Sequence, residues 1–325
     1  MLMAMELDQV EAFVAIVRGG GFTRAASILH LSQPAVSRRL ELLERELGAP
    51  LFERMPSGVI LTEAGKTFQP HAEALLASMR DGLDAVRALQ QLERGTVTLA
   101  LVGTLASTTL TGCLERFRVA HPGVKLGVRT ALSQEISALV RRGDATLGLR
   151  YGADPHPEMR SLTVYDEPMM VVCSRRHRFA RRRSVAPSAL AGEPWVAFPP
   201  RDGAYDEPYP WSLQHRLAAC GLRPAEIIAI DSLTAQKRMV EAGFGLALLP
   251  ESSVDEELRT GTLCAMRIAA MRVTIPVVLV HRRRAYLSGA ARALMAELAA
   301  WPTRQARRRR SNDPARGRRT GAARA

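Results

Sequence analysis

The segment Leu29–Gly48, LHLSQPAVSRRLELLERELG, constrains the fold of the N-terminal region more than any other stretch. Ser32 stands at a position suited to an N-cap, and Pro34 follows in the first turn, where its missing N–H costs nothing. The apolar positions that follow recur at helical spacing and are Val36, Leu40, Leu43 and Leu47. The segment therefore predicts an amphipathic helix with one buried stripe and a polar outward face.

Two further helices are predicted before this one. An apolar pattern with helical spacing runs from Leu7 to Val17 and stops at the glycines Gly19–Gly21. A short second helix opens at Phe22, and His30–Leu31 forms a tight connection to the third helix. Two short helices joined by a tight turn are typical of a helix-turn-helix, whose second helix meets base edges with its N-terminal end. A solvated helix face is the alternative interpretation of the same polar residues.

Two short apolar pieces follow at Leu51–Phe52 and Val59–Leu61, on either side of the turn residues Pro56–Gly58. They predict a small hairpin, or wing, directly after the recognition helix. Arg54 at the base of this hairpin would reach a backbone phosphate. Thr62 is expected to cap the next helix.

Residues 13–65 closely resemble the winged helix-turn-helix of LysR-type transcriptional regulators. The family patterns F-x-x-V, S-F-T-x-A-A, S-Q-P-A-x-S, L-E-x-x-L-G-x-x-L-F-x-R and L-T-x-A-G are matched by FVAIVRGGGFTRAASILHLSQPAVSRRLELLERELGAPLFERMPSGVILTEAG. The chain departs from the family at Gly21, which replaces a small polar residue, and in the wing at Met55–Pro56, which replaces more polar residues. The match covers more than fifty consecutive residues, so it is highly specific.

This resemblance implies DNA-binding roles for particular residues. The expected base and phosphate contacts of the recognition helix are Gln33, Pro34, Ser37 and Arg38. The expected phosphate anchors are Ser32, Arg54 and Thr62. Thr23 and Arg24 are expected to touch the DNA backbone from the second helix. The implied partner is double-stranded DNA carrying an interrupted palindromic operator, which two recognition helices about one DNA turn apart would read.

A long amphipathic helix is predicted from about Thr62 to Gln91, with Pro70 bending it near its start. Its apolar positions are Phe68, Ala72, Leu75, Met79, Leu83, Val86 and Leu89. The helix could pack on its own domain. We favour an antiparallel dimer seam, as the resemblance implies, because the segment joins two domains and has few neighbours of its own. Residues 66–95 are therefore assigned as a linker and dimerisation helix.

From residue 96 to about residue 300, apolar strand patterns alternate with helical stretches, which predicts an α/β domain. This region resembles the two-lobed effector domain of LysR-type regulators, which is itself similar to periplasmic solute-binding proteins. The resemblance implies that lobe one comprises about 96–166 and 270–300, and lobe two about 167–269. The predicted fold is thus multidomain: an N-terminal all-α winged helix-turn-helix (residues 1–65), a long linker helix and a C-terminal two-lobed α/β domain like a periplasmic binding protein.

Ligands of such folds lie in the crevice at the carboxyl ends of strands. On that basis the expected effector-binding residues are Thr104, Leu105, Ser133, Phe198, Pro199, Thr234 and Phe244. Arg150 and Arg201 are added because either guanidinium could pair with an anionic effector. For each arginine, an exposed surface ion pair is the alternative.

The formal net charge of +13 is concentrated at the C-terminus, where residues 301–325 hold nine basic residues and one acidic residue. This tail is expected to be solvated and disordered, with sequence-independent attraction to phosphates as the alternative. The four cysteines lie far apart without a C-x-x-C pair, which argues against a disulfide framework or a zinc site. The absence of a signal peptide and of an 18-residue apolar run indicates a cytoplasmic protein without membrane contact.

The chain contains no nucleotide-binding, hydrolase or metalloprotease motif, so neither an enzyme nor a cofactor is predicted. We expect a sequence-specific regulator, as a homodimer or homotetramer, that binds a small-molecule effector between its lobes and alters contact with RNA polymerase. One rival is a solute-binding protein, which would need an export signal. The other is a nonspecific binder driven by the tail, whose affinity would survive loss of Gln33 and Ser37.

Overall fold

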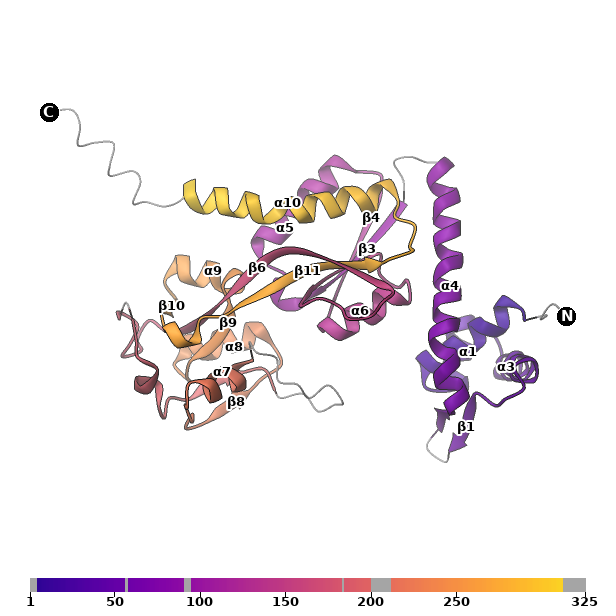
Figure 1. Cartoon of the computed structure of the whole chain (residues 1–325), viewed down its shortest axis with the longest axis horizontal. Coiled ribbons are helices and arrows are strands. Elements are labelled where there is room, and N and C mark those ends of the chain that lie inside the picture. The colour runs from indigo at the N-terminus through magenta and orange to yellow at the C-terminus, as the bar shows by residue number, and fades with distance from the viewer. Residues whose placement is uncertain (1–4, 56–57, 91–94, 183, 200–211, 312–325) are drawn as a thin grey trace.

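The computed structural model describes residues 5–55, 58–90, 95–182, 184–199 and 212–311. Figure 1 shows a small helical unit with a wing, a long helix α4 that rises from it, and an α/β region beside that helix. The α/β region has two lobes, and two long strands pass between them. The predicted fold class is therefore confirmed.

The N-terminal unit consists of α1 (Leu7–Gly19), α2 (Phe22–Leu29) and α3 (Gln33–Leu47). Each helix ends where the sequence predicts it. Gly20 and Gly48 take the left-handed conformation at φ 67° and 70°, which glycine adopts without steric cost. The Ser32 hydroxyl accepts a hydrogen bond from the Ala35 N–H at 3.4 Å and so caps α3.

Aromatic packing joins these helices to the wing, which is made of β1 (Phe52–Met55) and β2 (Gly58–Leu61). The Phe13 ring on α1 lies 5.3 Å from the rings of both Phe52 in the wing and Phe68 on α4, measured between centroids. Phe13 is fully buried. Burying such a ring stabilises the fold by about 2–3 kcal/mol, so this contact holds the wing and the linker helix against α1.

The helix α4 (Glu63–Gln90) contains Pro70 about two turns after its start, as predicted. One face packs against the N-terminal unit through the buried residues Ala72 and Leu76. The apolar side chains of Leu75, Leu83 and Val86 are exposed along the rest of the helix. These residues belong to the apolar face for which the sequence predicts a partner helix, and that pairing stays a prediction.

Lobe one is a five-stranded sheet in the order β4-β3-β5-β11-β6. Its strands are β3 (Gly95–Val102), β4 (Val124–Ala131), β5 (Leu147–Tyr151), β6 (Met159–Ser174) and β11 (Thr274–Arg282). The helices α5 (Thr108–Ala120) and α10 (Gly289–Ser311) cover one face, and α6 (Ser133–Arg141) covers the other. Strand β3 is parallel to β4 and β5, whereas β11 is antiparallel to β5 and β6.

Lobe two is built on the second half of β6. This strand pairs with β11 up to Pro168 and then with β9 from Met169. The lobe-two strands are β7 (Trp195–Ala197), β8 (Ile227–Ala229), β9 (Ala247–Pro250) and β10 (Leu263–Met266). A parallel bridge from Trp195 to Leu246 joins the β7-β8 pair to β9. The helices α7 (Leu213–Ala219), α8 (Leu233–Ala242) and α9 (Glu251–Thr260) pack on this sheet.

Three short helical turns complete the described elements: η1 (Gly103–Leu105), η2 (Pro187–Leu190) and η3 (Ala269–Met271). The sequence analysis did not predict β7, β10 or the first half of β6. That half, Met159–Pro168, mixes apolar with polar and charged residues and lacks the continuous apolar run of the predicted strands. Its pairing with β11 alone makes it a strand.

The predicted start of the disordered tail at residue 301 is wrong. Trp301 is 1% exposed and is the last member of a buried stripe on α10 made up of Ala291, Leu294, Leu298 and Trp301. The helix continues to Ser311 because Ala, Gln and Arg, all strong helix formers, predominate after Trp301. Residues 312–325 lie outside the described part of the chain.

Gly65 tests the packing of α4 against the wing. A Cβ at this position would overlap the Leu51 carbonyl oxygen and lie 2.8 Å from Leu61 Cδ2. We therefore expect Gly65→Ala to lower the free energy of unfolding in urea by about 3 kcal/mol. Gly82→Ala is the control, since a Cβ there meets nothing within 4 Å. It should leave stability unchanged or raise it by about 0.5–1 kcal/mol. Equal effects of the two substitutions would contradict this packing.

Candidate nucleic-acid interface and ligand site

The N-terminal end of α3 presents polar side chains to solvent. Ser32, Gln33, Pro34 and Arg38 are exposed, and Ser37 is half-buried. Gln33 and Ser37 line a groove of about 500 Å³ between α3, the α1–α2 turn and the wing. Its lining residues are Gly19, Gly20, Gly21, Phe22, Thr23, Arg24, Gln33, Ser37, Met55, Gly58 and Val59. The structure thus gathers Thr23, Arg24, Gln33 and Ser37 around one concave surface.

The hydrogen bonds of these side chains are weak enough to be exchanged for contacts with DNA. The Thr23 hydroxyl lies 3.4 Å from Gln33 Oε1, and the Ser37 hydroxyl lies 3.4 Å from Glu41 Oε1. Both distances are at the long end for hydrogen bonds, and both pairs are exposed. The first turn of α3, which is described in full, has no acidic side chain, so its N-terminus favours a phosphate.

Stronger contacts hold α3 and the wing in place. Arg39 pairs with Asp8 at 3.0 Å and ties α3 to α1. The Glu44 carboxylate accepts the Leu51 N–H at 2.6 Å, which fixes the loop between α3 and the wing. The sequence analysis missed Asp8 and Glu44, because the partner of each lies outside the pattern of its own helix.

Of the predicted phosphate anchors, Thr62 is hydrogen-bonded within the protein, and only the backbone of Arg54 is described. The Thr62 hydroxyl donates to the Pro50 carbonyl at 2.7 Å and accepts the Gly65 N–H, and the Thr62 N–H donates to Leu51. Both donors of Thr62 are therefore used inside the protein in this conformation. Arg54 lies in β1 opposite Val59, and its side chain is outside the described structure.

The strand directions define a second site, between the lobes. Strand β6 runs parallel to β3, β4 and β5 and continues past their carboxyl ends into lobe two. Strand β9 returns antiparallel to β6 and ends at Pro250, opposite Met169. Strands β7 and β8 run parallel to β9. The carboxyl ends of six strands, three from each lobe, therefore face one another, and this is where α/β sheets bind ligands.

Most of the predicted effector residues lie at this edge. Thr104 is in η1 after β3, and Ser133 begins α6 after β4. Phe198 and Pro199 directly follow β7, and Thr234 is in the first turn of α8. Thr104, Ser133, Phe198 and Thr234 are each at least partly exposed.

Four predicted effector residues are not among those that the described structure places at this edge. Leu105 is fully buried in the core of lobe one. Phe244 follows the C-terminus of α8 and precedes β9, so it lies at the opposite edge of the lobe-two sheet. A residue near a strand can stand at either end of it, and the sequence pattern did not separate the two ends. Arg201 lies outside the described residues.

Arg150 is the fourth of these residues. It lies on the α6 face of lobe one, where its guanidinium donates to Ser137 and forms an ion pair with Asp154 at 2.9 Å. The side chains of Arg150 and Asp154 are 7% and 5% exposed. Arg150 is therefore neutralised inside the lobe and does not form the exposed ion pair considered from the sequence.

The sequence analysis missed a polar network at the crossover. The Tyr151 hydroxyl lies 3.0 Å from Thr104 Oγ1. The Tyr165 hydroxyl donates to Glu167, which is 1% exposed and also accepts the Ser252 N–H of α9 at 2.9 Å. Burial raises the pKa of both tyrosines above the usual range, and the Glu167 charge adds to the rise. Glu167 thus links lobe one to the N-terminus of α9.

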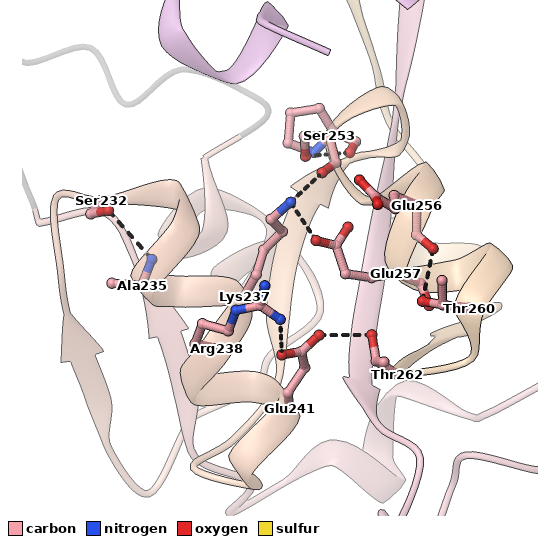
Figure 2. Close-up of polar contacts among 11 residues, drawn as sticks. Ser232, Ala235, Lys237, Arg238, Glu241, Ser253, Glu256, Glu257, Thr260 and Thr262 are labelled. Carbon is pink, nitrogen blue, oxygen red and sulfur yellow. Dashed lines mark hydrogen bonds and ion pairs between the residues drawn. The ribbon is translucent and has the colours of Figure 1, made fainter. Parts of the chain in front are cut away.

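Ionic contacts clamp α8 to α9 in lobe two. Figure 2 shows the Lys237 ammonium between the Glu257 carboxylate, at 2.6 Å, and the Ser253 carbonyl, at 3.1 Å. At the other end of α8, Glu241 pairs with Arg238 at 2.6 Å and accepts the Thr262 hydroxyl at 2.7 Å. The contacts of Lys237 and Glu241 keep the N-termini of α8 and α9 together at the interlobe edge.

These features define a DNA-binding protein whose winged helix-turn-helix is joined by one long helix to a two-lobed ligand-binding domain. Residues 7–66 match the model of the bacterial regulatory helix-turn-helix protein, lysR family, and residues 90–302 match that of the LysR substrate binding domain. The chain belongs to the LysR family. It is a transcriptional regulator with an effector-binding domain, and not an enzyme.

Individual relatives agree with this assignment. The HTH-type transcriptional regulator CfxR of Cupriavidus necator is 30% identical over 273 residues, which are 82% of this chain and 83% of CfxR. Full-length OxyR from Pseudomonas aeruginosa has the same fold, with a TM-score of 0.66 at 20% identity over 91% of this chain and 94% of that one. CbnR, solved in complex with its target DNA, matches with a TM-score of 0.60 at 22% identity. The match covers 91% of this chain and 100% of the CbnR chain.

Neither a membrane-spanning helix nor a metal-binding cluster is present in the described residues. None of the described helices is long and apolar enough to cross a bilayer. Within the same part of the chain, no three His, Cys, Asp or Glu side chains gather in a way that could hold a metal ion.

Stability should fall at alkaline pH. Burial raises the pKa of the Cys173 thiol to about 12, and Tyr151 and Tyr165 are raised as well. Above about pH 9 the unfolded chain loses protons that the native state keeps, which favours unfolding by about 1.4 kcal/mol per pH unit for each group. Urea unfolding between pH 8 and 10.5 measures this fall. Cys173→Ala should make it shallower between pH 9 and 10.5, and a flat profile in the unsubstituted protein would contradict the expected pKa shifts.

Proposed function

We propose that two copies of this chain read an interrupted palindromic operator with the N-terminal ends of their α3 helices. The observation that carries the proposal is the polar set Gln33, Ser37 and Arg38 on a helix held by buried contacts, of which Gln33 and Ser37 line the groove beside the wing. Gln and Arg recognise adenine and guanine bidentately, and Ser contacts bases or phosphate. Ser32, Thr23, Arg24 and Arg54 would then contact the DNA backbone.

Self-association supplies the second recognition helix. The exposed apolar residues Leu75, Leu83 and Val86 lie along α4 and would be covered by the same helix of another copy. A homodimer or a pair of dimers would place two α3 helices about one DNA turn apart. A cytoplasmic location is consistent with this role.

The proposed effector is a small anion bound between the lobes. The N-termini of α5, α6, α8 and α9 all lie at the interlobe edge and carry partial positive charge. Glu135 already accepts the Leu132 N–H at α6, and Glu167 occupies α9. The first turns of α5 and α8, both described, hold no acidic residue. An anion is best accommodated between them, near Thr104, Ser133 and Thr234.

The effector would act by binding two arrangements of the lobes or subunits with different affinity. A shift between them changes the spacing or angle of the two recognition helices and hence the bend of the bound DNA. The bend in turn alters the contact with RNA polymerase at a neighbouring promoter.

Selection of bound sequences from a random DNA pool tests the operator proposal. The full-length protein and a shortened chain ending at Ser311 should both enrich one interrupted palindrome with half-sites about a helical turn apart. Gln33→Ala and Ser37→Ala should each relax base preference within the half-site, at a cost of about 1–3 kcal/mol for the preferred sequence. Gln214→Ala removes an exposed glutamine from α7 and should leave selectivity unchanged.

The opposite outcome would favour the rival nonspecific binder. In that case no motif is enriched, and binding depends on residues 312–325 and falls steeply with salt.

A thermal-shift screen tests the effector site. Small carboxylates and phosphates should raise the melting temperature, whereas their neutral amides should not. Thr104→Val and Phe198→Ala should weaken the shift about tenfold in ligand concentration. Phe244→Ala is the matched control for Phe198→Ala, because Phe244 lies at the opposite edge of the sheet, and it should respond like the unsubstituted protein. Loss of the shift in Phe244→Ala alone would place the site elsewhere.

A further inference from the structure

The turn between α6 and β5 touches both the DNA-binding unit and the linker helix of its own chain. Its Asp144 carboxylate lies 3.2 Å from the Arg18 guanidinium of α1 and 3.4 Å from that of Arg80 on α4. The neighbouring Arg142 guanidinium is 3.2 Å away. One acidic side chain, 16% exposed, thus meets basic groups from three segments of the chain.

Close packing accompanies these ion pairs. Gly143, with φ 72°, sits so near α4 that a Cβ on it would be 3.2 Å from the Ala77 Cβ. Ala77 is fully buried, and the Arg80 guanidinium donates to the Arg142 carbonyl at 3.0 Å. A second ion pair, between Asp81 of α4 and Arg282 of β11 at 2.6 Å, flanks the contact. Figure 1 shows α6 and α1 on adjoining sides of α4.

The charge balance makes Asp144 the centre of this contact. An exposed single ion pair contributes little to stability. Here one carboxylate neutralises the mutual repulsion of three guanidiniums that are each partly buried. Without that carboxylate the three positive charges would drive α1 and α4 away from the turn.

The position of α6 connects this contact to the ligand site. Its N-terminal residue Ser133 lies at the interlobe edge, and its C-terminus leads directly into the turn Arg142–Asp144. Nine helical residues span about 14 Å. The helix packs on the sheet through the fully buried residues Ile136 and Val140, so a displacement of one end moves the other.

We propose that the Arg142–Asp144 turn docks the DNA-binding unit onto lobe one of the same chain, with Asp144 as the positioning residue. The docking restricts the orientation of α3 relative to the effector domain. A ligand at Ser133 would change that orientation through α6, and this second statement rests on the proposed effector function.

A zero-length cross-link tests the docking without DNA or effector. In the Arg18→Lys variant an amine replaces the guanidinium beside Asp144, and a carbodiimide should join position 18 to Asp144. Mass spectrometry of the digested protein should find this linked peptide in chains that run as monomers on a denaturing gel, because the contact is within one chain. Adding Asp144→Asn should abolish the product. Arg39→Lys, opposite Asp8 within the DNA-binding unit, is the positive control for the chemistry.

A missing product in Arg18→Lys, with a normal product in Arg39→Lys, would overturn the docking. A product found only in cross-linked dimers would overturn its assignment to one chain.

Tolerance of half-site spacing tests the positioning role. In the unsubstituted protein, two base pairs inserted between the selected half-sites should weaken binding about tenfold or more, because the α3 helices are held in one orientation. Asp144→Asn should reduce this penalty to about threefold or less. Glu193→Gln is the matched control, since Glu193 is 12% exposed and pairs with His177 and Arg178 inside lobe two. It should keep the full penalty.

The outcomes separate the two proposals. An unchanged spacing penalty in Asp144→Asn would overturn the positioning role even if the cross-link forms. Failure of every variant and of the unsubstituted protein to select DNA would instead overturn the proposed operator, while the cross-link would still decide the docking.

Discussion

Strand β6 determines how the two lobes face each other. It pairs with β11 as far as Pro168 and with β9 from Met169, so one extended segment belongs to both lobes. The directions of the other strands in the two lobes follow from this pairing, and they bring the carboxyl ends of six strands together. Each helix after one of these strands then points its N-terminus between the lobes. The proposed preference for an anion rests on these helix ends rather than on an arginine, since Arg150 is already paired with Asp154.

Both sites use the ends of helices that are held along their length by buried contacts. Helix α3 is fixed by Val36, Leu40 and Leu43, and its N-terminal end presents exposed polar side chains. Helix α6 is fixed by its buried face and has the interlobe edge at one end and Asp144 at the other. A rigid element with functional groups at its ends can transmit a small displacement without bending. The ionic contact at Asp144 is polar and partly exposed, so it can be broken and remade at lower cost than a packed core.

The sequence predicted those structural features that depend only on residues close together in the chain. The helix caps at Ser32 and Gly48, the wing and the place of Pro70 near the start of α4 are local features, and the structure confirms each of them. Errors appeared where the outcome depends on distant partners. Phe244 was placed at the ligand site because it was taken to follow a strand or turn, although only the direction of β9 decides which edge it occupies. The end of α10 was taken as disordered because its composition is basic, although Trp301 packs in T-shaped contact against Tyr165.

By itself, the sequence determined the class of protein and the helix-turn-helix, because such a unit is built from contacts a few residues apart. Periodicity, caps and turns are enough to specify such a unit. Only the tertiary structure decided which side chains meet across the chain: Glu167 with Ser252, and Asp144 with Arg18 and Arg80. These partners come from separate segments, and no local pattern records them. Their contact depends on the shared sheet and on the packing of α4, which place distant residues within hydrogen-bonding distance.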